Sequence, residues 1–265
     1  MWLDDSSSDR DQGSGEGSRP EERVTRTEAT PSGSDSEQSP AALKEGSHAG
    51  ALSASCEALF RATEQVLPWA WKLLQLAKGP GALSGAARAA SLEFLDRIPP
   101  HVRRGVSELQ AFSNLWQAVC TRLGRPVARS TEELQRELNE DLQLLLRGAQ
   151  ARLGTTAALE QGLLLHLGRL RESRGTEPGA ALELRAALDA FTHAVTEVMA
   201  AASAYRRAWE SAEAELSESA AWLGAGDPGF CAWLAEHLSA SVPAWREAHA
   251  SSRLLQELGA LSSPR

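Results

Sequence analysis

The sequence contains very few of the residues from which β-sheets are built. Its 265 residues include one isoleucine, one tyrosine and nine valines, against 45 alanines and 38 leucines. β-Branched and aromatic side chains favour strands, whereas alanine and leucine are strong helix formers. Sandwiches, barrels and doubly wound α/β folds are therefore excluded, and we predict an all-α protein. Hydrophobic residues make up 42% of the chain, which also excludes collagen-like and fully disordered classes.

Cysteine is also scarce. Cys56, Cys120 and Cys231 are an odd number of widely spaced residues, unlike a disulfide framework or a zinc ribbon. Each lies within a helical pattern, where a free cysteine normally behaves as a small buried hydrophobe. We therefore expect three buried thiols and a reducing compartment.

Long apolar runs are missing as well. The richest run, Gly162 to Leu170, contains His166 and Arg169 and is far shorter than the roughly 20 residues that cross a bilayer. The first residues are acidic where a secretory signal is basic. These features predict a cytoplasmic protein, with the nucleus as an alternative, that is neither secreted nor membrane-spanning.

Charge divides the chain near residue 50. Residues 1–50 contain 11 acidic and 5 basic residues and ten serines, whereas the remainder is nearly neutral, with 24 acidic and 22 basic residues. The first segment has too little apolar surface to offset the entropy of ordering it. We therefore predict a disordered acidic tail over 1–50 and a helical domain over 51–265. The nearly neutral domain lacks the clustered positive charge that nucleic-acid binding requires.

From Leu52 onward, apolar residues recur at spacings of three and four, which is typical of amphipathic helices. In chain order, we predict helices over 52–78, 85–97, 101–123, 131–153, 155–170 and 176–223, and two more that begin at Pro228 and Pro243. Pro68 should kink or divide the first helix, and Pro99, Pro100 and Gly154 should end others. The expected fold is an antiparallel bundle of about six to eight helices with one long helix.

Two helix starts carry clear capping signals. Ser130 and Glu133 have the spacing of a capping box, and Asp227 precedes Pro228 as an N-cap. The stretch 176–223 is the long helix, and at 1.5 Å per residue it would extend about 70 Å. Its apolar stripe must be covered by the rest of the chain or by a second copy, so it is our candidate seam for a coiled-coil homodimer.

Catalytic and ligand-binding motifs are absent from the sequence. It has no nucleophile elbow and no glycine-rich phosphate-binding loop. His193 and Glu197 share a helix face, and Cys231 lies near His237, but neither set reaches three metal ligands. We therefore expect no catalytic, cofactor-binding or metal-binding residues and predict that the protein is not an enzyme.

The tryptophans suggest a partner surface. There are eight, and Trp69 and Trp71 closely follow Pro68. Two positions apart on a helix, they cannot share one narrow face. We predict that the patch around Trp69 and Trp71 binds a partner, since tryptophan is enriched at binding hot spots. The alternative is that both are buried because the segment is enclosed on two sides.

The tail carries candidate modification sites. An acidic residue stands three positions after each of five serines, as acidophilic kinases require, and two further sites precede proline. The phosphorylation candidates are Ser6, Ser8, Ser18, Ser32, Ser34, Ser39 and Thr30. Trp2 and Leu3 are an apolar pair among acids and could form a short docking motif.

These features favour a non-enzymatic adaptor that binds another protein and has a phosphorylatable tail. The alternative is a helical lipid-binding or membrane-remodelling module of the crescent-dimer type, which the long helix favours. The chain has only three lysines, Lys44, Lys72 and Lys78, and its helical domain is nearly neutral. Both features count against a surface that binds anionic lipid.

Overall fold

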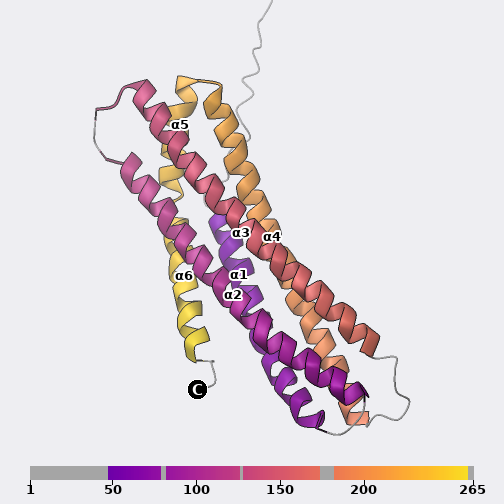
Figure 1. The fold of residues 1–265 in the computed structure, drawn as a ribbon. Coiled ribbons are helices and arrows are strands. Elements are labelled where there is room, and N and C mark those ends of the chain that lie inside the picture. The colour runs from indigo at the N-terminus through magenta and orange to yellow at the C-terminus, as the bar shows by residue number, and fades with distance from the viewer. Residues whose placement is uncertain (1–46, 79–81, 126–127, 174–181, 262–265) are drawn as a thin grey trace, which may run out of the picture. The chain divides into compact units, whose positions relative to one another are not determined.

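The computed structural model describes residues 47–78, 82–125, 128–173 and 182–261. These residues form helices and no strand, which confirms the all-α class for this part of the chain. The six helices are α1 (Ser47–Leu76), α2 (Ala82–Leu123), α3 (Thr131–Ser173), α4 (Leu182–Gly224), α5 (Pro228–Ala240) and α6 (Val242–Leu261) (Figure 1). The predicted tail lies almost wholly outside the described residues, but α1 begins at Ser47, inside the segment assigned to that tail.

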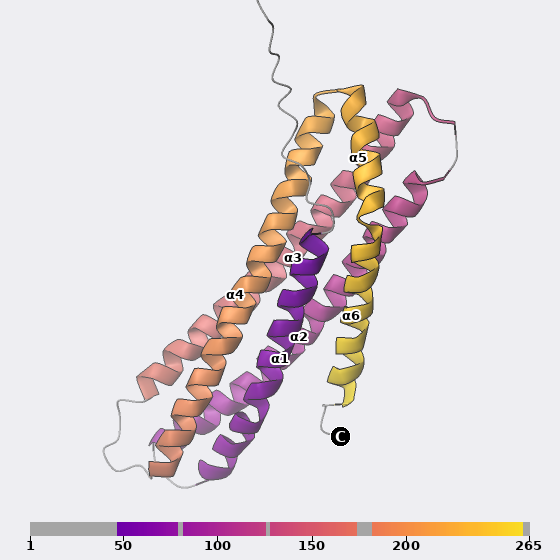
Figure 2. The ribbon, with the colours of Figure 1, turned by 180° about the vertical axis from the view of Figure 1, so that it is seen from behind.

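The three longest helices, α2, α3 and α4, run side by side through the bundle and alternate in direction (Figures 1 and 2). The remaining position is shared. In one half of the bundle it is occupied by α1, which packs on α2 and α4, and beyond the start of α1 it is occupied by α5. α6 runs beside the first half of α1, from Trp245 near His48 to Gly259 against Phe60.

The apolar stripe of α4 forms the centre of the core. Tyr205 and Trp209 are fully buried, and Val195 has no exposed surface. α1 and α3 make the most extensive contacts with α4, so this stripe is covered within the chain. The face that the sequence offered as a homodimer seam is therefore already occupied by the chain's own helices.

The helices continue through prolines that were predicted to interrupt them. α1 continues through Pro68, and α2 continues through Pro99 and Pro100 as one helix of 42 residues. Each proline removes one amide donor from the helical ladder. The flanking Ile98 and Val102 are buried in the core, and this packing holds the helix together across the missing hydrogen bonds.

Gly154 does not end a helix either. It lies inside α3, which is 43 residues long. A glycine inside a helix costs only about 1 kcal/mol relative to alanine. The hydroxyls of Thr155 and Thr156 donate to the carbonyls of Ala151 and Leu153 within the same helix.

The expected number of helices is therefore too high. α5 and α6 meet at a single residue, Ser241, and counting them as one leaves a bundle of five helices among the described residues. The expectation of one long helix is also wrong, because α2, α3 and α4 have 42, 43 and 43 residues.

The predicted caps are confirmed. The Glu133 amide donates to the Ser130 hydroxyl over 3.2 Å, and the Ser130 amide donates to the Glu133 carboxylate over 3.0 Å. These bonds to Ser130 lower the pKa of Glu133. At the start of α5, the Asp227 carboxylate accepts from the Gly229 amide over 2.8 Å. Local sequence thus determines where α3 and α5 begin.

Candidate functional site

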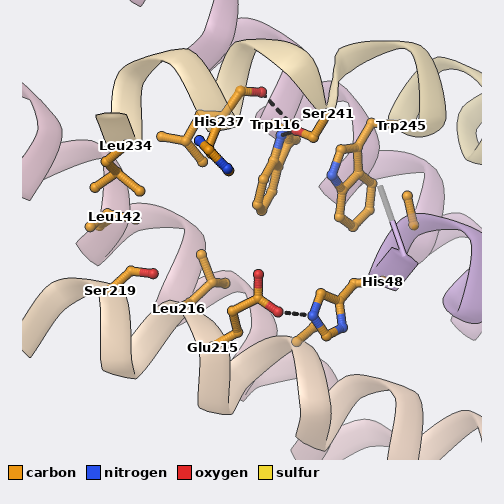
Figure 3. Close-up of a pocket in the computed structure, with 13 residues that line it drawn as sticks. His48, Trp116, Leu142, Glu215, Leu216, Ser219, Leu234, His237, Ser241 and Trp245 are labelled. Carbon is orange, nitrogen blue, oxygen red and sulfur yellow. Dashed lines mark hydrogen bonds and ion pairs between the residues drawn. The ribbon is translucent and has the colours of Figure 1, made fainter. Parts of the chain in front are cut away.

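A cavity of about 50 Å³ lies beyond the N-terminal end of α1, where α5 meets α6 (Figure 3). It lies in line with α1, at the point where that helix begins. All six helices line it. The larger apolar residues of the wall are Trp116, Leu142, Leu216, Leu234, Leu238 and Trp245, and the polar ones are His48, Glu215, Ser219, His237 and Ser241.

His48 and Glu215 form the principal polar contact of the cavity. His48 Nε2 lies in hydrogen-bond contact with the Glu215 carboxyl group, which joins the first turn of α1 to α4 (Figure 3). Burial raises the pKa of Glu215 to about 7, and the nearby Glu218 adds to this effect. Burial also lowers the pKa of His48. Both shifts favour an uncharged pair, in which a carboxyl group is hydrogen-bonded to a neutral imidazole.

Two further groups face the cavity. Ser219 is buried and its side chain points into the space, where it makes no hydrogen bond to a described residue (Figure 3). The His237 Nδ1 lies 3.2 Å from the Trp233 carbonyl. Since a carbonyl only accepts, Nδ1 carries the proton and Nε2 of a neutral ring is left as an acceptor. The cavity therefore presents one free hydroxyl and one free imidazole nitrogen.

The polar groups of the cavity do not form a serine–histidine pair. A serine nucleophile needs an imidazole within hydrogen-bond reach, and Ser219 contacts neither His48 nor His237 in that way. A volume of about 50 Å³ holds a few water molecules or one small group. Within the described ranges, no set of three His, Cys, Asp or Glu side chains could hold a metal ion.

A second hollow, of about 150 Å³, lies between α2 and α3 beside His166. This imidazole is 2% exposed, and neither ring nitrogen has a hydrogen-bond partner, although Nδ1 lies 3.6 Å from Glu93 Oε2. Burial lowers the pKa of His166. Arg97 and Arg169 both pair with Glu93 Oε1, so two guanidinium groups share this one carboxylate.

The three cysteines are free and buried, which confirms that prediction. Burial raises the pKa of Cys56 and of Cys120 to about 12, so neither thiol ionises at neutral pH. Cys120 Sγ also donates to the Leu238 carbonyl at 3.0 Å. These cysteines therefore act as core residues rather than as reactive groups.

The structure separates the two tryptophans of the predicted partner patch. Trp71 is 48% exposed, whereas Trp69 is half-buried against the core with the Lys72 ammonium 5.5 Å from its ring centre. Trp222, at the end of α4, is also exposed and lies beside Phe230. Trp222 was not among the residues predicted from the sequence. The role of Trp69 and Trp71 in partner binding stays a prediction.

One exposed surface was missed at the sequence level. Every exposed residue of α3 between Gly148 and Gly168 is uncharged. These eight residues, which we call the α3 face, are Gln150, Ala151, Gly154, Ala157, Ala158, Gln161, Leu164 and Leu165. The stretch also contains two charged residues, but both are bonded to neighbouring helices. Arg152 donates to the Glu108 carbonyl of α2, and Glu160 accepts from Arg206 of α4.

The candidate phosphorylation sites and the Trp2–Leu3 pair lie outside the described residues. No described helix is both long and apolar enough to cross a membrane. Comparisons with known proteins gave no match to a family model, a curated protein or a solved structure.

Proposed function

We propose that the chain is a non-enzymatic adaptor whose helical domain binds another protein through the α3 face. The observation that carries this proposal is the absence of charge from eight consecutive exposed positions on α3. Charged residues make up 23% of the chain. Contiguous uncharged surface on a soluble domain is typical of a contact with another molecule.

The contrast within α3 supports this reading. Before Gly148, the exposed residues include Glu132, Arg136 and Glu140, and after Gly168 they include Arg171. The middle of the same helix presents Leu164 and Leu165 to solvent with 50% and 56% of their surface exposed. The two most exposed leucines of α3 therefore lie within one uncharged stretch of about 30 Å.

The lipid-binding alternative has weaker support. The three long helices suit an elongated membrane-binding module, but anionic lipid attracts clustered basic residues. The α3 face has none, so its chemistry fits an apolar protein surface better. Co-sedimentation with liposomes rich in phosphatidylserine separates the two, and we expect the protein to stay in the supernatant.

The tail completes the proposed adaptor. Its Ser/Thr sites would add negative charge on phosphorylation and so change the affinity of this segment for basic partners. Phosphopeptide mapping of the protein isolated from cells tests this part directly. An unmodified tail would remove regulation from the proposal and leave the α3 face unaffected.

The α3 face is tested by one leucine substitution and its matched control. Leu165 on α3 and Leu254 on α6 are exposed to 56% and 57%, so Leu165→Glu and Leu254→Glu place the same charge on equally exposed surface. Quantitative affinity purification should lose specific partners with L165E and retain them with L254E. Equal recovery with both variants would refute the proposal. Circular dichroism of both variants checks that the fold is kept.

A further inference from the structure

The α3 face has an internal order that points to its partner. Gln161 is preceded at four positions by Ala157 and followed at four positions by Leu165. At three positions it is preceded by Ala158 and followed by Leu164. A helix turned end for end about Gln161 therefore presents leucine opposite Ala157 and Ala158, whereas Ala151 at the edge of the α3 face lies opposite Arg171. Large side chains would meet small ones, which is how packed helices interdigitate.

Two of the four glycines of α3 follow the same symmetry, whereas Gly162, which is equally open, lies opposite Glu160. Gly154 and Gly168 stand seven positions before and after Gln161, and no atom of the chain lies within 4 Å of a Cβ built on either. Gly148 differs, because its added Cβ would lie 3.2 Å from the Phe112 ring. Intrachain packing thus accounts for Gly148 but not for Gly154 or Gly168. Glycine at such open positions allows another backbone to approach closely.

Charge at the two ends of the α3 face selects the same orientation. Arg147 precedes the uncharged stretch and Glu172 follows it, and both side chains are exposed. In an antiparallel pair centred on Gln161, Arg147 of one copy lies within one helical turn of Glu172 of the other. A parallel pair would instead place leucine on leucine, Arg147 beside Arg147 and Glu172 beside Glu172, and like charges repel.

We infer that the α3 face binds a second copy of this chain, with the two α3 helices antiparallel and the two-fold axis at Gln161. This inference rests on the proposed function, whose protein partner it identifies as the chain itself. The contact is isologous, so each residue pair occurs twice. The amide side chains of the two Gln161 residues meet at the axis.

The contact is small. Eight exposed residues on each side compare with the roughly 20–30 of a standard interface. The dimer is therefore weak and depends on protein concentration, and a covalent trap is the most direct way to detect it.

Gln161→Cys supplies this trap, because a residue on the two-fold axis lies beside its own copy. Packed helix axes are about 8–10 Å apart, which brings facing Cα atoms within disulfide range. Gln143→Cys is the matched control, since Gln143 is also an exposed glutamine of α3. In the proposed register, its copy lies about 50 Å away. The native cysteines are buried and give no background.

Under mild oxidation, Q161C should form a disulfide-linked dimer and Q143C should remain monomeric on non-reducing gels. L165E added to Q161C should abolish the cross-link, and L254E should leave it unchanged. In sedimentation velocity, R147E should weaken self-association and R147E/E172R should restore it. Restoration by opposite charge is a result that a folding defect cannot produce.

Failure of Q161C to cross-link, or equal cross-linking of Q161C and Q143C, would overturn the dimer. The proposed function would survive that result if L165E still loses cellular partners that L254E retains. If L165E changes neither the cross-link nor partner recovery, the dimer and the proposed function both fall.

Discussion

Glu215 should make the stability of the bundle depend on pH in a way that one substitution removes. Its carboxyl group lies in the cavity against His48, with 25% of its side-chain surface exposed. Burial raises its pKa from the ordinary value of 4.5 to about 7. The folded protein therefore binds this proton more tightly than the unfolded chain does.

The sign of the effect follows from linkage. Below the unfolded pKa both states are protonated and Glu215 has no effect on stability. As the pH rises from about 4.5 to about 7, the unfolded chain loses the proton first, and the folded state is progressively destabilised. At about 1.4 kcal/mol for each tenfold change in proton affinity, the difference amounts to about 3 kcal/mol above pH 7, and to less if water reaches the carboxylate.

Glu215→Gln retains a hydrogen bond to His48 but cannot ionise. Relative to wild type, its free energy of unfolding should increase by about 2–3 kcal/mol between pH 4.5 and 7 and then level off. The lowered pKa of His48 has the opposite sign, because a neutral imidazole must gain a proton on unfolding below its ordinary value of 6.5. Comparing E215Q with wild type at each pH isolates the carboxyl group.

Urea denaturation followed by tryptophan fluorescence at a series of pH values measures this difference. Glu197 lies exposed on the same helix, so Glu197→Gln makes the same chemical change outside the cavity. We expect its difference from wild type to stay constant with pH. An E215Q curve that runs parallel to wild type would show that Glu215 is fully ionised at neutral pH and that the cavity does not exclude water from it.

Three further predictions concern stability and surface. Val195→Asp buries an unpaired charge in the core and should lower the free energy of unfolding by about 4 kcal/mol. A variant as stable as the parent in thermal denaturation would contradict the assignment of Val195 to the core. Gly154→Ala should stabilise α3 by about 0.5–1 kcal/mol, whereas Gly148→Ala should destabilise it by crowding an aromatic ring, and equal shifts in Tm would contradict this reasoning. Trp71→Ala should reduce partner recovery with little change in Tm, because Trp71 is exposed. Trp69→Ala should lower the Tm through lost core packing. Loss of stability in both variants would exclude a surface role for Trp71.

The sequence predicts the helices well where the signal is local or periodic. The hydroxyl of Ser130 and the carboxylates of Glu133 and Asp227 cap helices as expected, because a cap involves only residues of one turn. The stripe on α4 is readable because its apolar residues recur at one spacing, and Val195 lies on its buried side.

Helix ends were predicted poorly where tertiary packing outweighs a local penalty. Pro99 and Pro100 are strong breakers, but Ile98 and Val102 are held in the core on either side of them. The energy of that packing depends on residues of other helices, so no window of sequence around the prolines contains it. The same holds for Gly154, whose small helical penalty is overridden along a helix of 43 residues.

The cavity could not be predicted, because the residues that form it are distant in sequence. His48 and Glu215 are 167 residues apart, and His48 was assigned to the tail. Their contact depends on the residue at which α1 begins relative to α4, which follows from packing alone. The α3 face did leave a signal, namely a run of exposed positions without charge, but it becomes visible only once the buried side of α3 is known.

The sharing of one position by α1 and by α5 has a consequence for synthesis on the ribosome. α1 to α4 already form a closed four-helix layer in one half of the bundle, so this layer can fold as soon as α4 has emerged. The other half remains open, with the apolar side of α2 and the wall of the future cavity uncovered, until the last two helices arrive. A pause or premature stop after α4 would therefore leave a partly folded chain with exposed apolar surface in its open half. Chaperone binding should be concentrated at that stage of translation.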